Sequence, residues 1–457
     1  MKIVILGAGQ VGSSVAESLV SEQNDITVVD LDGARLRALQ DRLDLRTVTG
    51  SAAHPSVLAE AGIEDADLLI AVTQSDETNL VACKLASQLF NVPRRVARIR
   101  ATDFLNDDKV LGPEGFEVDL SICPEQVLTD YLAKLVEFPE ALQVLDFADG
   151  RVSLVAVRAY TGGPLVGHPL KDLRQHMPGV DARVVAIFRK DAAVTPDGNT
   201  VIEAGDEVFC LAAAKDIRQV MKELRRMDRA VSRIMVAGGG NIGLRLARAL
   251  EGSYSVRLVE HNKRRCEMLA AKVEHALVLN GDATDEELLE EENIAEMDLF
   301  IAVTNDDENN IMSSLLAKRM GARRVVALIN RRSYVDLVQR AQIDIAISPA
   351  QATIGKLLAH VRRGDVVAVH SLRRGAAEAL EAVVHGDRDS CRVTDRRIEE
   401  IELPPGTTIG AIVRGEEVLM AHHDTRIAAG DHVIVFVTDK KIVPRVEKLF
   451  QVGARFL

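Results

Sequence analysis

The chain has 457 residues, of which 47% are hydrophobic and 27% are charged, and its formal net charge is −12 at pH 7. This composition is that of a folded globular protein and excludes an intrinsically disordered chain. The length predicts roughly two to four domains. The acidic charge argues against nucleic-acid binding, which requires a basic surface.

Cysteine usage and hydropathy indicate the cellular setting. The five cysteines are scattered, with no C-x-x-C pair, which fits buried thiols in a reducing cytoplasm rather than disulfides or a zinc site. No run approaches the roughly eighteen consecutive apolar residues of a membrane span, and the chain starts directly with a predicted strand. We therefore expect neither a transmembrane helix nor a signal peptide.

The first dozen residues combine a strand, a glycine turn and a helix. Lys2 to Leu6 is an apolar, β-branched run typical of a buried strand. Gly7, Gly9 and Gly12 follow in G-x-G-x-x-G spacing, and a periodic helix begins within the turn. The first glycine permits the tight turn, the second leaves room for a pyrophosphate, and the third lets helix and strand pack closely. The helix N-terminus offers free N–H groups to the phosphates.

An acidic residue at the end of the second strand strengthens this interpretation. The run Ile26-Thr-Val-Val-Asp30 ends eighteen residues after Gly12, where a carboxylate should bind ribose hydroxyls. An acid there disfavours a 2′-phosphate, so NAD or an unphosphorylated adenosine is favoured over NADP. The alternative is a glycine-rich turn on an α/β sheet that binds no ligand.

Strands and helices alternate from the start of the chain, which predicts a doubly wound parallel sheet. Either Ser75 or Asp76 should cap the helix that follows the fourth strand. The predicted strands lie at 2–6, 26–30, 45–49, 67–72 and 95–100, and the predicted helices at 10–22, 32–42, 54–61 and 76–90.

The same pattern then recurs, with an offset of 230 or 231 residues. GAGQVG at Gly7 matches GGGNIG at Gly238, and Glu260 matches Asp30. Further matched runs are Gly50-Ser51-Ala52 with Gly281-Asp282-Ala283, AVTQSDETN with AVTNDDENN, and VARIR with VALIN. Five matched segments in one order indicate duplication of a whole domain, because the period is too long for a solenoid repeat.

The segments after each sheet also match. A helix should begin at Pro124 and another at Pro349, since proline suits the first helical position. A small β-rich module follows each, with Gly-Asp turn signals at 205–206 and 430–431. The charged amphipathic helix over 216–227 is predicted to be a solvated linker between the halves.

These motifs identify a resemblance to the TrkA family of tandem RCK (regulator of potassium conductance) proteins, covering essentially the whole chain. The resemblance implies two Rossmann-like doubly wound parallel sheets, each followed by a small α+β, β-rich C-lobe. It also implies binding of NAD(H), ATP or ADP, a tetrameric gating ring, and a Trk-type membrane pore subunit as the partner. The expected location is cytoplasmic, at the inner membrane through that partner. The expected divisions are N-lobe 1 at 1–122, a crossover helix at 123–139, C-lobe 1 at 140–215, a linker helix at 216–230, N-lobe 2 at 231–347, a second crossover helix at 348–363 and C-lobe 2 at 364–457.

The candidate nucleotide-binding residues come from the motifs and their repeats. In the first half they are Gly7, Ala8, Gly9, Gln10, Val11, Gly12, Asp30, Gly50, Ser51, Thr73, Gln74 and Arg98. In the second half they are Gly238, Gly239, Gly240, Asn241, Ile242, Gly243, Glu260, Gly281, Asp282, Thr304 and Asn305. Thr73 and Gln74 follow the C-terminal end of a strand, where ligands bind in open α/β sheets, although a simple loop and helix cap remains an alternative.

Arg98 is predicted to lie in a buried strand, where an unpaired cation is costly. Either a ligand phosphate or an acid of the same domain would pair with it, whereas Arg100 at the strand end is predicted to be solvated. Leu328 and Asn330 replace these arginines in the second half. The second site should therefore make fewer cationic contacts to additional phosphates.

Three functions are compatible with these residues. The favoured one is a non-enzymatic, ligand-sensing regulatory subunit, because two nucleotide-binding units and two small lobes account for the chain and no large substrate domain remains. The alternatives are an NAD-dependent oxidoreductase and a nucleotide sensor that acts on a soluble partner. No catalytic residue or metal ligand is assigned. His422-His423-Asp424 is interpreted as a group of exposed polar side chains rather than a metal site, because adjacent strand residues point to opposite faces and rarely share one ion.

Overall fold

The computed structural model describes residues 1–20, 24–105, 108–190, 192–224, 230–331, 334, 338, 342–361, 366–372 and 377–452. By its contacts the chain divides into two compact units. The first contains the N-terminal sheet, and the second contains the other three sheets. Among the described residues, no helix combines the length and apolar character that crossing a membrane requires.

The first sheet has six strands in the order β3-β2-β1-β4-β5-β6, and each adjacent pair is parallel. This order reverses direction between β1 and β4, which is where ligands bind in doubly wound folds. The strands are β1 (Lys2–Leu6), β2 (Asp25–Asp30), β3 (Arg46–Thr49), β4 (Leu68–Ala71), β5 (Arg95–Arg98) and β6 (Leu120–Ile122). The helices are α1 (Gln10–Val20), α2 (Gly33–Gln40), α3 (Pro55–Glu60), α4 (Asp76–Gln88), α5 (Thr102–Leu105), α6 (Asp108–Leu111) and α7 (Pro124–Glu137).

The second N-lobe repeats this architecture with the strand order β14-β13-β12-β15-β16-β17. Its strands are β12 (Arg233–Ala237), β13 (Ser255–Glu260), β14 (Leu277–Asn280), β15 (Leu299–Ala302), β16 (Arg324–Leu328) and β17 (Ile345–Ile347). Its helices are α10 (Asn241–Leu250), α11 (Lys263–Ala270), α12 (Glu286–Glu291), α13 (Asp307–Arg319) and α15 (Pro349–Val361). The predicted pair of Rossmann-like sheets is thus confirmed.

Each C-lobe contains a five-stranded antiparallel sheet and short helices, as expected for a small β-rich module. In the first, the order is β10-β9-β11-β8-β7, and in the second it is β18-β19-β22-β20-β21. The first contains β7 (Ala141–Phe147), β8 (Val152–Arg158), α8 (Leu173–His176), β9 (Ala182–Arg189), β10 (Ala192–Val194), β11 (Glu207–Ala213) and α9 (Ile217–Leu224). The second contains β18 (Val366–Leu372), β19 (Ala377–Val383), β20 (Thr407–Arg414), β21 (Glu417–Met420), β22 (His432–Val437) and α16 (Val443–Phe450).

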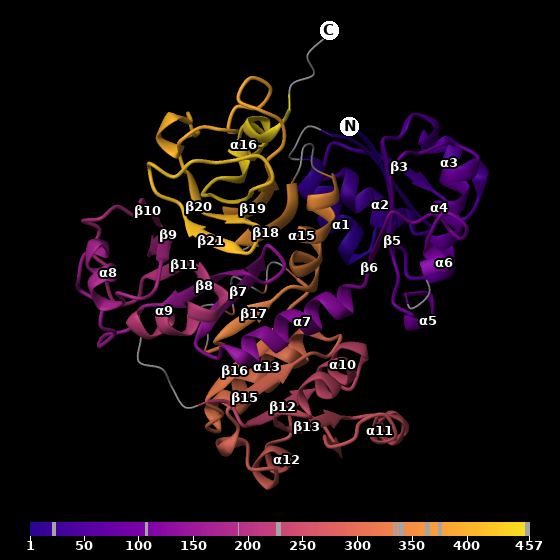
Figure 1. The fold of residues 1–457 in the computed structure, drawn as a ribbon. Helices are drawn as coiled ribbons and strands as arrows, with labels where there is room; N and C mark the ends of the chain where they lie inside the picture. The colour runs from indigo at the N-terminus through magenta and orange to yellow at the C-terminus, as the bar shows by residue number, and fades with distance from the viewer. Residues whose placement is uncertain are drawn as a thin grey trace. The chain divides into compact units, whose positions relative to one another are not determined.

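Helix α15 comes from the second half of the chain but belongs to the first compact unit. It packs beside α1, and Figure 1 shows the orange α15 next to the indigo α1. The guanidinium of Arg94 donates a hydrogen bond of 3.0 Å to the carbonyl oxygen of His360, at the end of α15. The first unit is therefore completed by a segment from the second half.

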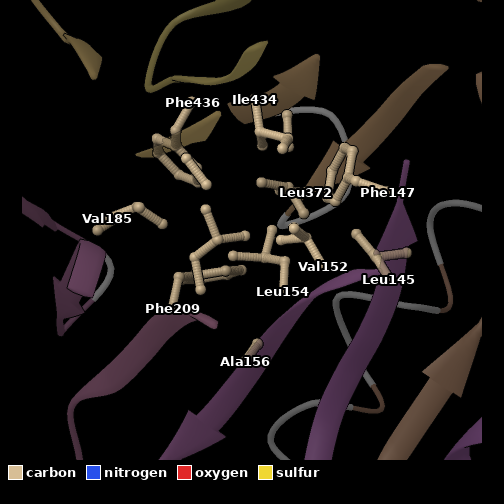
Figure 2. Close-up of a cluster of buried hydrophobic side chains, with 14 of the residues drawn as sticks. Leu145, Phe147, Val152, Leu154, Ala156, Val185, Phe209, Leu372, Ile434 and Phe436 are labelled. Atoms are coloured by element: carbon tan, nitrogen blue, oxygen red, sulfur yellow. The ribbon is translucent and has the colours of Figure 1, made fainter. Parts of the chain in front are cut away.

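The two C-lobes share one hydrophobic core within the second unit. Phe209 of the first lobe and Phe436 of the second have ring centroids 5.9 Å apart. Figure 2 shows side chains of both lobes converging, with Phe147, Leu154 and Phe209 meeting Leu372, Ile434 and Phe436. A Cβ on Gly410 of β20 would lie 3.0 Å from a methyl group of Val185, so the close approach of the sheets requires glycine there.

The prediction of a solvated linker over 216–227 is wrong for its described part. In α9, Ile217, Val220, Met221 and Leu224 are buried, and the helix packs on β8 and β11. Its apolar stripe, spaced by three and four residues, completes the core of the first C-lobe. Residues 225–229, including Arg225 and Arg226, lie outside the described residues.

Candidate functional site

Corresponding glycines of the two turns are subject to the same steric constraints. Gly7 and Gly238 adopt φ values of +108° and +109°, which only glycine adopts easily. A Cβ on Gly12 would overlap the carbonyl oxygen of Gly7, and one on Gly243 would overlap that of Gly238. These four glycines are therefore required by the backbone itself.

The middle glycines differ, because a Cβ on Gly9 or on Gly240 would meet no heavy atom within 4 Å. Nothing in the fold of the described residues demands glycine there. The open space lies at the N-terminus of α1 or α10, beside N–H groups that α-helices leave unpaired at their first turn. This geometry suits a ligand phosphate that needs close backbone approach.

The predicted ribose acids lie beside these turns, at the ends of β2 and β13. The Asp30 carboxylate accepts hydrogen bonds from the backbone N–H of Ala8 at 2.5 Å and of Asp32 at 2.8 Å. The Glu260 carboxylate accepts the equivalent bonds from Gly239 at 2.9 Å and Asn262 at 2.8 Å. Each acid thus ties its glycine turn to the next loop of the same site.

The two turns differ in the residue after the first glycine and in the acid that contacts it. Where the first half has Ala8 and Asp30, the second has Gly239 and Glu260. A Cβ on Gly239 would lie 3.0 Å from Oε2 and 3.1 Å from Cβ of Glu260, and would also overlap Leu269. The side chains of Leu269 and Glu260 therefore together occupy the volume that an alanine methyl group would need.

We expect Gly239→Ala to lower the free energy of unfolding by about 1–3 kcal/mol, since an added methyl group overpacks this turn. The double variant Gly239→Ala/Glu260→Asp, which copies the first half, should recover part of that loss. Denaturant unfolding of the single and double variants measures this coupling. Strictly additive effects would contradict it.

A cavity of about 450 Å³ opens beside the second turn. The residues that line it include Gly240, Glu260, His261, Arg264, Arg265 and Met268. Its wall therefore joins the glycine turn to the start of α11. Asn262 is the N-cap of helix α11, and its side-chain oxygen accepts a hydrogen bond from the backbone N–H of Arg265.

Polar loops follow β4 and β15 at the carboxyl ends of these strands. The Thr73 hydroxyl donates to the side-chain oxygen of Asn79 at 2.7 Å, and Ser75 caps α4 as predicted. The Asn79 amide also donates to the carbonyl oxygen of Arg98 at 2.9 Å. Asn79 thus joins the ends of two adjacent strands to α4.

Asn79 and its counterpart Asn310 were missed by sequence reasoning. Asn310 makes the same bonds, to Thr304 at 2.7 Å and to the carbonyl oxygen of Leu328 at 2.9 Å. Both asparagines are fully buried. The available signal was the final asparagine shared by AVTQSDETN and AVTNDDENN.

Arg98 pairs with an acid of its own lobe. Its guanidinium lies 2.8 Å from the Glu125 carboxylate, and both side chains are largely buried. Its Nε atom is buried and has no hydrogen-bond partner among the described residues. Of the two partners predicted for Arg98, an acid of the same domain is thus present, and one donor stays available.

The expectation that Arg100 is merely solvated is wrong. Its Nε lies 3.3 Å from the carboxylate of buried Asp76, and its guanidinium also donates to the carbonyl oxygen of Gln74. Asp76 in turn accepts the backbone N–H of Arg100 at 2.8 Å. Arg100 therefore fixes the loop that carries Gln74.

The remaining candidate residues lie at the same sheet edges. Gln10, Val11, Asn241 and Ile242 begin the helices after the turns, and Gln10 and Asn241 are exposed there. Gln74 and Asn305 are exposed in the loops after β4 and β15. Gly50, Ser51, Gly281 and Asp282 follow β3 and β14. A Cβ on Gly50 or Gly281 would strike Val57 or Leu288, so packing alone accounts for these two glycines.

The other polar cluster noted in the sequence makes ordinary contacts. His422 Nε2 lies 2.9 Å from the guanidinium of Arg174. In the described part of the chain, no group of three or more histidine, cysteine, aspartate or glutamate residues is arranged to hold a metal ion.

Comparison with known proteins assigns the family. The TrkA-N domain profile matches residues 3–115 and 234–349, and the TrkA-C domain profile matches 154–225 and 388–451. The Trk system potassium uptake protein TrkA of Halomonas elongata is 59% identical over 456 residues, covering 100% of both chains. Its namesake from Vibrio alginolyticus is 58% identical over 458 residues, again covering 100% of both.

Solved structures support the fold. The crystal structure of the GsuK RCK domain aligns with a TM-score of 0.62 at 19% identity, covering 98% of this chain and 94% of the other. The GsuK channel bound to NAD aligns with a TM-score of 0.61 at 18% identity, covering 98% and 78%. The duplicated turns, the paired lobes and these full-length matches show that the chain belongs to the TrkA family of tandem RCK proteins.

Proposed function

We propose that this chain is a nucleotide-binding regulatory subunit that gates a Trk-type potassium uptake system. The observation that carries the proposal is the pair of glycine turns, in which a Cβ on Gly9 or Gly240, at a helix N-terminus, would meet no heavy atom within 4 Å. Relatives named for potassium uptake match along the whole chain, which supports the transport role. The proposed domain divisions are those expected from the sequence, except that α9 is assigned to C-lobe 1.

We propose that both N-lobes bind adenine nucleotides, with NAD(H), ATP and ADP as the ligands. Backbone N–H groups at the turns would bind the phosphates, and Asp30 and Glu260 would lie nearest the ribose. A GsuK channel has been solved with NAD and with ADP, which supports this class of ligand. The proposed assembly is a homotetrameric ring on the cytoplasmic face of a membrane pore subunit.

The proposed mechanism is a population shift between ring conformations. A nucleotide moves the equilibrium only by the difference between its affinities for the two states. Arg98 connects the crevice of the first sheet to Glu125 in the first turn of α7, whose later residues belong to the second compact unit. A phosphate that competes for Arg98 would weaken its ion pair with Glu125. The first turn of α7 would then be held less firmly to the first sheet.

Potassium flux through the reconstituted pore subunit tests this function. Flux should depend on this chain and change when ATP, ADP, NAD or NADH is titrated. Nucleotide-independent flux would refute the gating mechanism. Turnover of NADH with a small carbonyl substrate would instead support the oxidoreductase alternative, whereas co-purification with only soluble proteins would support a sensor of a soluble partner.

Arg98 and Glu125 offer a matched test of the first site, because Leu328 and Ala350 occupy these positions in the second half. Arg98→Leu/Glu125→Ala removes both charges together and avoids an unpaired buried carboxylate. We expect ATP affinity at the first site to fall roughly ten- to hundredfold, as losing a charge-assisted phosphate contact implies. NADH affinity at the second site, measured in the same titrations, is the internal control. Unchanged ATP affinity would contradict a phosphate role for Arg98.

A further inference from the structure

The adenosine ends of the two sites carry different charges. After the ribose acid, the first half has Leu31, Asp32, Gly33 and Ala34, whereas the second has His261, Asn262, Lys263 and Arg264. Arg264 and His261 line the 450 Å³ cavity beside the second glycine turn. The second site therefore lacks counterparts of Arg98 and Arg100, but it has additional cations after the ribose acid.

These additional cations are not neutralised within the described structure. Lys263 and Arg264 are exposed, and neither forms an ion pair with a described carboxylate. In the first half, the carboxylate of Asp32 lies 3.3 Å from Arg35. Asn262 replaces that aspartate and removes the negative charge while still capping the helix.

The acid that would ordinarily repel a ribose phosphate has a histidine neighbour in the second site. Glu260 is 9% exposed, and its two carboxylate oxygens accept the backbone N–H groups of Gly239 and Asn262. The His261 ring lies 3.1 Å from Oε1 of the same carboxylate, where the first half has exposed Leu31. Asp30 receives equivalent amide bonds, so the histidine is the difference at Glu260. Arg264 lines the cavity, whereas Lys263 is exposed and does not line it.

We propose that the second site accepts an adenine dinucleotide with a phosphate on its adenosine ribose, and that the first site excludes it. A ribose 2′-phosphate beside Arg264 and Lys263 would meet two cations and one helix N-terminus. At the first site the same phosphate would meet Asp30 and Asp32, of which Asp32 is paired with Arg35, together with the Arg37 guanidinium near Gly33. The inference rests on the proposed nucleotide-binding function and assigns its two halves different ligands.

Calorimetric titration of the full chain with NADPH and NADH tests the proposal. The parent chain should bind NADH at both sites and NADPH at only one. Lys263→Gly/Arg264→Ala, which copies the first half, should weaken NADPH binding at least about tenfold and leave NADH within about twofold. Lys272→Ala removes an exposed cation outside the cavity and should change neither affinity.

The reciprocal variant Asp32→Asn/Gly33→Lys/Ala34→Arg gives the first site the second site's residues. A Cβ on Gly33 meets its neighbours no closer than 3.5 Å, so the exchange is sterically tolerated. A second NADPH site should appear in this variant. Equal NADPH affinity in the parent and in Lys263→Gly/Arg264→Ala would overturn the inference.

Two competition experiments test whether the ribose phosphate is the group that the second site recognises. 2′,5′-ADP should compete with NADPH at least about tenfold better than 5′-ADP, because only the former carries the ribose phosphate. Inorganic phosphate competing as well as 2′,5′-ADP would indicate non-specific charge attraction and would overturn the inference. NADH binding without NADPH binding would refute this inference alone, whereas loss of binding of both would refute the proposed function as well.

Discussion

Gly9→Glu should abolish nucleotide binding at the first site while the chain remains folded. A side chain on Gly9 meets no heavy atom of the protein within 4 Å, so its cost to folding is small. The added carboxylate would project into the space proposed for the phosphates and repel them. We expect at least a roughly hundredfold loss of affinity at that site, about 3 kcal/mol. Gly240→Glu should do the same at the second site.

Calorimetric stoichiometry separates the two sites. Either single variant should bind NADH at one site per chain, and the double variant at none. Circular dichroism and unfolding midpoints close to those of the parent would show that folding is intact. Gly12→Ala is the contrasting variant, because its Cβ would overlap the Gly7 carbonyl and destabilise the whole turn. Two intact NADH sites in Gly9→Glu would contradict the placement of the phosphates.

Local sequence was sufficient to predict the glycine turns and the acids beside them. The φ of Gly7 and the contact between Gly12 and Gly7 depend only on residues close in the chain, so their spacing was diagnostic. The duplication added a second observation of each position. Asn79 and Asn310 are repeated in the same way. Their role, however, depends on a hydrogen bond to the end of the next strand, β5 or β16, which short-range patterns do not reveal.

The features that sequence could not predict depend on contacts between distant segments. The acid that pairs with Arg98 lies 27 residues away on α7, and several acids of the lobe were equally plausible partners. The charges on α9 suggested a solvated helix, yet its apolar stripe packs on β8 and β11. The shared C-lobe core likewise joins Phe209 to Phe436 across 227 residues of chain.

Each C-lobe contains, at the same position, an ion pair between a buried aspartate and a partly exposed arginine, and removing the acid should be destabilising. Arg189 Nη2 lies 2.8 Å from Asp206, and Arg414 Nη2 lies 2.8 Å from Asp431. Both aspartate side chains are 1% exposed. Asp206→Ala leaves the Arg189 Nε and the Glu203 backbone N–H without their acceptor, although Arg189 keeps Glu203 and the Val201 carbonyl oxygen, so we expect a loss of about 1–3 kcal/mol in the free energy of unfolding. Asp431→Ala should have a similar effect, and exposed Asp424→Ala very little.

The Asp206 effect should depend on pH. Burial raises the pKa of Asp206, but hydrogen bonds from Arg189 and from the Glu203 backbone N–H outweigh it, so the net pKa is lowered. A lowered pKa contributes stability that is fully present above the unfolded-state value, about 3.9, and is lost as pH falls through the folded-state value. The difference between parent and Asp206→Ala in denaturant unfolding should therefore be largest near neutral pH and shrink below about pH 4.

Arg189→Met/Asp206→Leu removes both charges and should be more stable than Asp206→Ala, since neither partner is left unpaired. A double variant as unstable as Asp206→Ala, with a deficit that does not change with pH, would show that packing rather than the ion pair stabilises this lobe.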